Sequence, residues 1–187
     1  MPHIHTENNQ HELTVTAYIV RIDTPEPKVL LHMHRKLNML LPVGGHVELS
    51  ETPWQAIAHE IVEESGYLIE QLDILQPKSR IKKMTRVVQH PYPLSMNTHD
   101  LPSKHFHTDI QYAFVTSSDP AMDTKQGESL DLRWLTRNEL KELPSASIFE
   151  NTQEVYQFVL EQALKTWERV PARSFVLEFP EEYLSWA

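Results

Sequence analysis

The sequence predicts an α+β fold in which a mixed β-sheet packs between helices. Three observations support this prediction: apolar stretches near the N-terminus have the character of strands, a capped amphipathic helix follows them, and a long stretch near the C-terminus repeats with helical spacing. The length of 187 residues suits one core. We therefore expect a single domain over 1–187.

A strand with two different faces is predicted near the N-terminus, because apolar residues alternate there with other residues. The apolar set is Leu13, Val15, Ala17 and Ile19. A neighbouring strand is predicted at 28–33, after a turn that contains prolines. Further strands are predicted near 67–75, 80–88, 107–116 and 129–135.

The middle of the chain predicts a helix that begins after Thr52 and ends before Gly66. Thr52 and Gln55 form a capping box, in which each side chain satisfies a backbone N–H of the other. Pro53 suits the first helical position, because the N–H that it lacks has no helical partner there. Gly66 suits the position after the last turn, where the backbone is left-handed. An apolar stripe is expected to face the core: Trp54, Ile57, Ala58 and Ile61.

Two helices are predicted in the C-terminal part of the chain. Thr136 and Glu139 form a second capping box, which predicts a short helix after the strand at 129–135. A longer helix is predicted over about 148–168, where apolar and aromatic residues recur at helical spacing. Residues 170–187 are too apolar for a free tail, so we expect them to dock on the domain or on a partner subunit, and a homodimer is a further expectation. Residues 1–10 are polar and predict a flexible tail.

Composition excludes several classes of function. The formal charge of −9 argues against binding a nucleic-acid polymer or an anionic membrane, because both need a basic surface. The absence of cysteine excludes thiolate catalysis, disulfides and cysteine-bound zinc. No apolar run is long enough for a membrane span or a secretory signal, so a cytoplasmic location is the expectation.

Three glutamates share one face of the central helix. Glu60, Glu63 and Glu64 stand at positions i, i+3 and i+4. Like charges at these spacings cost roughly 0.2–0.5 kcal/mol per pair. Such a cluster is either a solvated acidic face or a site for a hard cation such as Mg²⁺ or Mn²⁺, which prefer oxygen ligands.

The spacing around these glutamates resembles the Nudix box of the Nudix hydrolase superfamily. The family pattern is Gly-x5-Glu-x7-Arg-Glu-U-x-Glu-Glu-x-Gly-U, where U is a bulky apolar residue. This chain matches it from Gly45 to Tyr67, with Glu51 in the loop before the helix, except that His59 stands where the family has arginine. The resemblance implies a Nudix-type α/β/α sandwich.

The resemblance also implies a metal-dependent hydrolase that cleaves the phosphoanhydride bond of a nucleoside diphosphate derivative, with Mg²⁺ or Mn²⁺ as cofactor. By position, Gly45, Glu60, Glu63 and Glu64 would hold the metal, and Glu63 or Glu64 would be the general base, with Glu128 and Asp109 as alternatives outside the box. In the family, Glu51 pairs with the arginine that orients the catalytic glutamates, so here its partner would be His59.

The replacement of arginine by His59 has two interpretations. Arginine is a permanent planar cation, whereas histidine is charged only below a pKa near 6.5. Either Glu51 holds His59 in place and the enzyme works, or the protein is a catalytically impaired Nudix-fold module that binds a nucleotide or ADP-ribose. The sequence does not identify a particular nucleoside diphosphate derivative. Isopentenyl diphosphate isomerases share the fold but use a cysteine, which this chain lacks.

A second cluster of polar residues precedes a predicted strand. His105, His107 and Asp109 share one face of an extended chain, and His46 lies beside the box glycine. Two histidines and a carboxylate suit zinc, the wall of a substrate cleft, or ordinary hydrogen-bonded strand positions. Similar strands accompany similar boxes in uncharacterised Nudix relatives, so the resemblance favours the wall of the active-site cleft.

Overall fold

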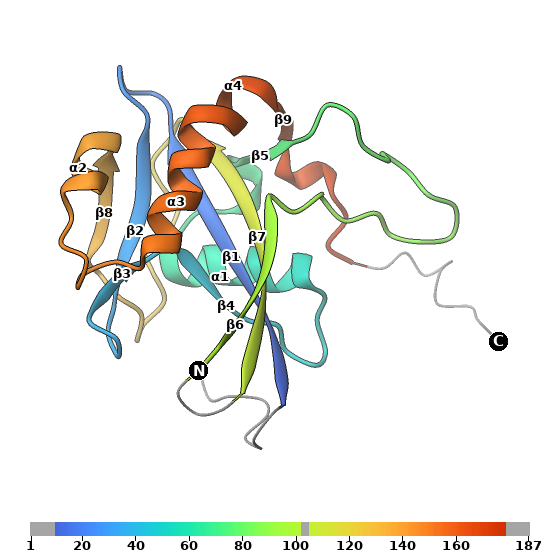
Figure 1. Cartoon of the computed structure of the whole chain (residues 1–187). Coiled ribbons are helices and arrows are strands. Elements are labelled where there is room, and N and C mark those ends of the chain that lie inside the picture. The colour runs from blue at the N-terminus through green and yellow to red at the C-terminus, as the bar shows by residue number, and fades with distance from the viewer. Residues whose placement is uncertain (1–9, 102–104, 179–187) are drawn as a thin grey trace.

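A computed structural model describes residues 10–101 and 105–178 of the chain. Its described residues form one mixed sheet in the order β3-β2-β1-β7-β5-β9, with β4 paired to β1, β6 to β7 and β8 to β2 (Figure 1). The central pair, β1 and β7, is parallel, and the other pairs are antiparallel. The strands are β1 His11–Arg21, β2 Lys28–His34, β3 Met39–Leu41, β4 Val43–His46, β5 Asp73–Gln76, β6 Ser95–Asp100, β7 Phe106–Thr116, β8 Leu132–Thr136 and β9 Glu168–Pro171.

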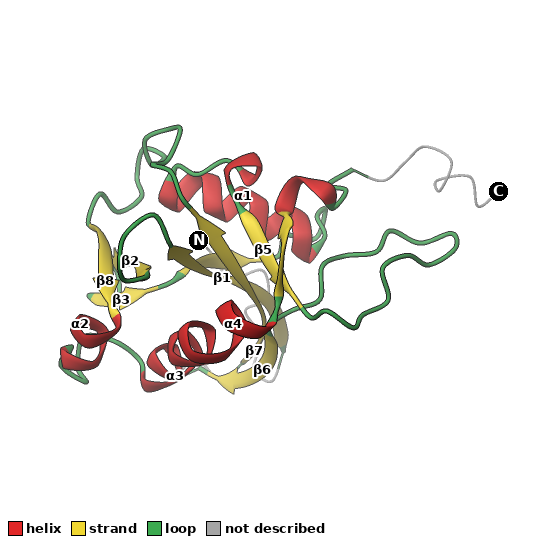
Figure 2. Ribbon diagram, turned by 90° about the horizontal axis from the view of Figure 1, so that it is seen from above, coloured by secondary structure: helices red, strands yellow, loops and turns green. Residues whose placement is uncertain are grey.

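Helices cover both faces of this sheet, as Figure 2 shows. Helix α1 lies on one side, and α3 and α4 lie on the other. The helical elements are α1 Pro53–Ser65, α2 Arg137–Glu142, α3 Glu150–Phe158, a π-helical stretch Val159–Ala163, α4 Leu164–Thr166, and short 3₁₀ turns at Ile69–Gln71 and Ala172–Ser174. The predicted sheet between helices is confirmed.

Strand β1 contributes to two separate cores, as its two-faced pattern predicted. Val15 and Ile19 pack with Trp54 and the rest of the apolar stripe of α1. Tyr18 on the other face packs with Tyr156 of α3, and the two rings meet edge to face at 4.8 Å. Burial on both faces fixes the register of the strand, because a slip by one residue would exchange its faces.

The local signals of α1 match its observed ends. Thr52 Oγ1 accepts a hydrogen bond from Gln55 N, and Thr52 N donates to Gln55 Oε1 at 2.8 Å. Gly66 has φ +71°, and an added Cβ would lie 2.0 Å from the carbonyl oxygen of Met122. Glycine is therefore required there both by the left-handed backbone and by the close approach of a neighbouring loop.

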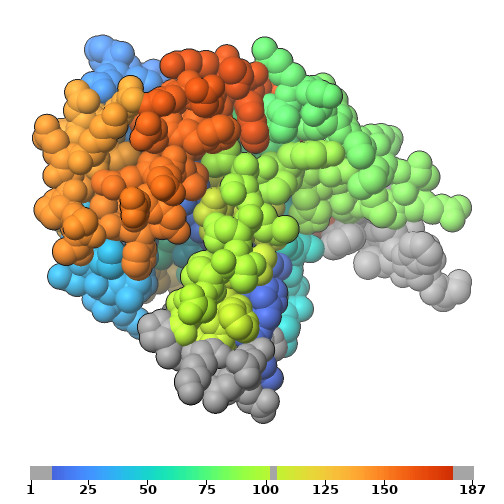
Figure 3. Space-filling model, in the orientation of Figure 1, coloured from blue at the N-terminus to red at the C-terminus, as the bar shows by residue number. Residues whose placement is uncertain are grey.

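One of the strand predictions was wrong and another was only partly right. Residues 80–88 form no strand but belong to the connection between β5 and β6, which extends away from the body of the domain (Figures 1 and 3). The stretch 67–75 contains a 3₁₀ turn before β5 begins at Asp73. Strands β3, β4, β6 and β9 were not predicted, and the long C-terminal helical run spans 150–166 rather than 148–168.

The described part of the C-terminal segment packs on the domain. Phe175 and Leu177 are partly buried against the core beside α1, and Trp54 Nε1 donates to the carbonyl oxygen of Phe175 at 3.4 Å. Residues 179–187, and residues 1–9 of the tail predicted at 1–10, lie outside the described residues. Among the described helices, none combines the length and apolar character that a bilayer span requires.

Candidate active site

A cleft of about 420 Å³ crosses β1, β4, β7 and the C-terminal half of α1. Its lining is acidic at one end, where Glu60, Glu64 and Glu128 gather. Towards β7 the lining contains imidazoles, from His46, His99 and His107, and other polar side chains. The cleft therefore joins the box helix to the second polar cluster that the sequence indicated.

Glu64 and Glu60 are buried carboxylates. Glu64 Oε2 accepts a hydrogen bond from the backbone N–H of Gly44 at 2.9 Å. Burial raises the pKa of Glu64 to about 8, and the nearby Glu60 and Glu128 carboxylates act in the same direction, against the hydrogen bond from Gly44. Burial likewise raises the pKa of Glu60 to about 7. Two such groups lose their charge near neutral pH unless a cation stabilises it.

The chemistry of this donor set fits a hard divalent cation. His32 Nε2 lies 3.5 Å from Glu64 Oε2, but burial lowers the pKa of His32 to about 4, so the ring is neutral and does not balance the carboxylate. The other close acidic groups, Glu60 and Glu128, add negative charge. Carboxylate oxygens are the preferred ligands of Mg²⁺ and Mn²⁺.

Glu63 points to a different environment from the other two box glutamates. It is not part of the cleft lining, and its Oε1 accepts hydrogen bonds from Lys125 and from His59 Nε2, the latter at 2.7 Å. Burial alone would raise the pKa of Glu63, but the bonds from Lys125 and His59 outweigh burial and lower it. Glu63 was predicted for the site, but its partner Lys125 was not, because Lys125 lies on a loop distant in the chain.

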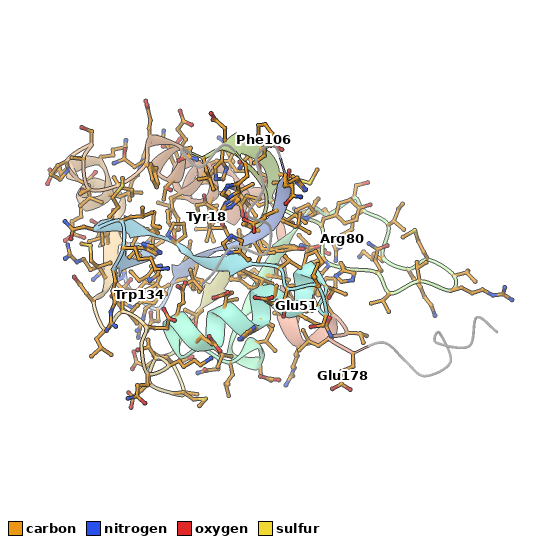
Figure 4. All side chains as sticks on the ribbon, turned by 90° about the horizontal axis from the view of Figure 1, so that it is seen from below. Tyr18, Glu51, Arg80, Phe106, Trp134 and Glu178 are labelled. Atoms are coloured by element: carbon orange, nitrogen blue, oxygen red, sulfur yellow. The ribbon has the colours of Figure 1, made fainter. Side chains whose placement is uncertain are left out.

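His59 lies between two glutamates of the box. Its Nδ1 is 3.7 Å from Glu51 Oε2, and its Nε2 is bonded to Glu63. Figure 4 shows Glu51 beside α1. Burial acts to lower the pKa of His59, but Glu63, Glu60 and Glu51 together raise it. Because the side chain is 44% exposed, solvent screens these charges.

The two glycines of β4 bring the backbone close to the acidic end of the cleft. Gly45 pairs with Val15 of β1, and both Gly44 and Gly45 line the cleft. An added Cβ on Gly44 would lie 2.2 Å from the carbonyl oxygen of Val15. Gly45 was the glycine predicted for the site, whereas Gly44 donates the hydrogen bond to Glu64. The two glycines are adjacent in the sequence, and this pair was the feature that could have indicated both.

Asp109 forms hydrogen bonds with threonine and glutamine side chains of the central strands. Its carboxylate accepts hydrogen bonds from Thr16 at 2.9 and 3.0 Å, from Thr14 at 3.1 Å and from Gln111 at 2.9 Å. Burial raises the pKa of Asp109 in spite of these bonds. Asp109 lines the cleft, but its hydrogen bonds tie it to the central strands.

The histidines converge instead on Glu12, which the sequence analysis missed. Glu12 Oε2 lies 3.1 Å from His107 Nε2, 3.3 Å from His105 Nε2 and 3.3 Å from His46 Nε2. Burial lowers the pKa of His107 to about 4, with His46 acting in the same direction. A signal was present, because Glu12 continues the polar face of Thr14 and Thr16 along the predicted first strand.

Comparison with known proteins agrees with the resemblance in the sequence. Residues 12–157 match the model of the NUDIX domain. A hydrolase of the NUDIX family from Clostridium perfringens is 28% identical, with a TM-score of 0.64 over 80% of this chain and 96% of that one. Comparison with curated proteins gave no match.

Two more distant structures share the fold. A C. elegans Ap4A hydrolase is 16% identical, with a TM-score of 0.59 over 78% of this chain and 93% of that one. The NUDIX domain of Shewanella oneidensis NrtR, complexed with ADP ribose, is 14% identical, with a TM-score of 0.58 over 80% of this chain and 86% of that one.

Proposed function

The chain belongs to the Nudix hydrolase family, and from this premise we propose that it is a metal-dependent hydrolase of a phosphoanhydride bond in a nucleoside diphosphate derivative. The observation that carries the proposal is the pair of buried carboxylates, Glu60 and Glu64, in a cleft that also contains Glu128. Burial of several acidic groups together is costly unless a cation accompanies them.

The groups that would hold Mg²⁺ or Mn²⁺ are the carboxylates of Glu60 and Glu64 and the carbonyl of Gly45. Glu63 would join them when its carboxylate leaves Lys125 and binds the ion. Such an ion, when bound, neutralises phosphate charge and acidifies water. The backbone N–H of Gly44 orients Glu64 by its hydrogen bond to Oε2.

The candidates for the general base are the carboxylates of the cleft and of the Nudix box. Asp109 is the weakest candidate, because Thr14, Thr16 and Gln111 already bond to its oxygens. Glu63 and Glu64 are the candidates from the box, and Glu128 is the candidate from the loop before β8. A base must reach the water that it deprotonates, so substitution of each in turn separates these roles.

A nucleotide-type substrate suits the size and polarity of the cleft. A volume of about 420 Å³ is within the range for small-molecule sites. One protein that shares the fold is an Ap4A hydrolase and another is a domain complexed with ADP ribose, which supports the same broad class of substrate here. His46, His107 and Asp109 line the part of the cleft formed by β4 and β7, which would face the substrate. A cytoplasmic location and a homodimer stay as predictions.

The alternative function is a binding module without turnover. His59 in place of arginine favours it, because an exposed imidazole that shares its charge between Glu51 and Glu63 orients them less firmly than a guanidinium would. The resemblance to a domain bound to ADP ribose is compatible with this alternative at the level of the fold.

The deciding experiment measures release of phosphate or nucleoside monophosphate from a panel of nucleoside diphosphate and triphosphate derivatives. Wild type, Glu63→Gln, Glu64→Gln and Glu128→Gln are assayed with Mg²⁺, with Mn²⁺ and with chelator. Metal-dependent release that is lost in a box variant supports the hydrolase. Nucleotide binding by folded protein with no release from any substrate would contradict it and support the binding module.

A further inference from the structure

Three strands bring four side chains to one point outside the Nudix box. Glu12 and His107 are direct partners in the parallel pairing of β1 with β7. His46 ends β4, which runs beside β1, and His105 immediately precedes β7. The cluster therefore lies at the end of the sheet where β1 and β7 begin (Figure 1). Its members are far apart in the sequence, so their convergence is a property of the fold.

The distances from Glu12 to the three histidines are close to those between the ligands of a tetrahedral metal ion. Bonds of about 2.0–2.1 Å from zinc to nitrogen or oxygen separate the ligand atoms by roughly 3.3–3.4 Å. Glu12 Oε2 lies 3.1 Å, 3.3 Å and 3.3 Å from the Nε2 atoms of His107, His105 and His46. The ligand atoms of Glu12, His105 and His107 all lie within 4.8 Å of one another.

The side chains of the cluster are buried, which favours the binding of a cation. The Glu12 side chain is completely buried, and those of His105, His107 and His46 are 4%, 12% and 13% exposed. A carboxylate withdrawn from water is stabilised by a neighbouring cation. His46 and His107 also line the cleft, whereas Glu12 and His105 lie behind its wall, so an ion could enter from the cleft.

The donor types differ from those at the acidic end of the same cleft. Glu60, Glu64 and Glu128 offer only carboxylate oxygens, which suit Mg²⁺ and Mn²⁺. Imidazole nitrogens with one carboxylate suit Zn²⁺ and similar transition-metal ions. We propose that Glu12, His105 and His107 form a second metal site, with His46 beside Glu12 as a fourth ligand, which binds one ion such as Zn²⁺ and joins β1, β4 and β7.

The proposal is tested by direct metal binding to the full chain without substrate. Chelator-treated protein is supplied with excess Mg²⁺ and titrated with Zn²⁺ against a chromophoric competitor. We expect one equivalent of Zn²⁺ per chain, binding that persists in Glu64→Gln, and a rise in melting temperature on Zn²⁺ addition. Co²⁺ in place of Zn²⁺ should give the visible absorption of a tetrahedral nitrogen and oxygen site.

Matched variants locate the bound ion. Glu12→Gln and His107→Ala should each weaken Zn²⁺ binding by at least about ten-fold, which is the loss typical of removing even an outer partner of a metal ligand. His90→Ala is the control, because His90 lies in the connection between β5 and β6. Circular dichroism of the metal-free variants checks folding, and if Glu12→Gln does not fold, His107→Ala and His46→Asn on the cleft wall carry the test.

Three outcomes would overturn the second site. They are no Zn²⁺ uptake by the wild type, an affinity in both cluster variants equal to that of the wild type, and binding that is kept in both cluster variants but lost in His3→Ala/His5→Ala. The last result would assign the ion to the N-terminal histidines. The titration contains no substrate, so failure of this proposal leaves the hydrolase proposal intact. Absence of hydrolysis would equally leave the zinc site intact.

Discussion

Glu64→Gln is expected to stabilise the metal-free protein while it removes activity. Glutamine has nearly the same shape and keeps an oxygen that can accept the hydrogen bond from Gly44 N, but it carries no charge. In the folded protein the pKa of Glu64 is raised by burial to about 8, whereas the ordinary value is 4.5. Between these two values the folded state holds a proton that the unfolded chain has lost, so stability falls as the pH rises.

The size of this effect follows from the two pKa values. At pH 7 the solution is about 2.5 pH units above the pKa of Glu64 in the unfolded chain and still below its pKa in the folded protein. Each pH unit corresponds to about 1.36 kcal/mol, so ionisation of Glu64 in the unfolded chain lowers the free energy of unfolding by up to about 3 kcal/mol. The variant escapes this cost, because glutamine is neutral in both states. Below pH 4.5 the two proteins should be almost equally stable.

Urea unfolding in chelator measures the prediction at several pH values between 4 and 8. The difference in the free energy of unfolding between variant and wild type should increase as the pH rises. Glu154→Gln, on the exposed side of α3, should show no such difference. Added Mg²⁺ should stabilise wild type more than Glu64→Gln, since the ion binds the ionised carboxylate. A gap that is constant with pH would refute the argument that burial of this carboxylate opposes folding.

Further substitutions test the neighbours of this carboxylate and the fold around it. His59→Arg should keep or raise the hydrolysis rate and His59→Ala should lower it, whereas equal rates in all three proteins would mean that Glu51 and His59 do not position the site. Lys125→Met should tighten Mg²⁺ binding, measured by calorimetry, because the ion no longer competes with the ammonium for Glu63; unchanged affinity would argue against Glu63 as a ligand. Gly66→Ala should cost about 2 kcal/mol or more in urea unfolding, since alanine at φ +71° is strained and its Cβ meets Met122; a loss below 0.5 kcal/mol would contradict the close approach.

Local chemistry explains why the central helix could be predicted with its ends. The capping box at Thr52 and Gln55, the proline that follows Thr52 and the left-handed Gly66 all act within a few residues of where they stand. The Nudix pattern likewise fixes the spacing of residues within one helix and its flanking loops, from Gly45 to Tyr67. For these reasons Glu60 and Glu64 could be assigned to the site before any tertiary structure was known.

The failures concern strands, whose formation depends on distant partners. Residues 80–88 contain apolar side chains, yet Ile81, Met84 and Val87 remain about half exposed, because no neighbouring strand pairs with them. Strand β6 was missed for the opposite reason. Its residues are mostly exposed and polar, and it is held by backbone pairing with β7 rather than by a buried face.

Glu12 shows the same dependence on distant partners at the level of a site. The sequence places it on the polar face of the first strand with Thr14 and Thr16, but does not indicate which residues it meets. Its role depends on the parallel register that sets it opposite His107, and on β4, which brings His46 to the same oxygen. A sequence pattern can indicate that two histidines share a face, but only the register of the sheet supplies the carboxylate.

Strand β4 connects the two donor sets of the cleft. Gly44 N–H holds Glu64 at the acidic end, and His46, two residues later, reaches Glu12. A shift of this short strand would therefore change both sites together. If Zn²⁺ at the histidine cluster alters the affinity for Mg²⁺ at the glutamates, thermodynamic linkage requires Mg²⁺ to alter the affinity for Zn²⁺ by the same factor. Loss of this coupling in Gly44→Ala, whose added Cβ would meet β1, would identify β4 as the coupling element. Independent affinities in the wild type would mean that the two ends of the cleft act separately.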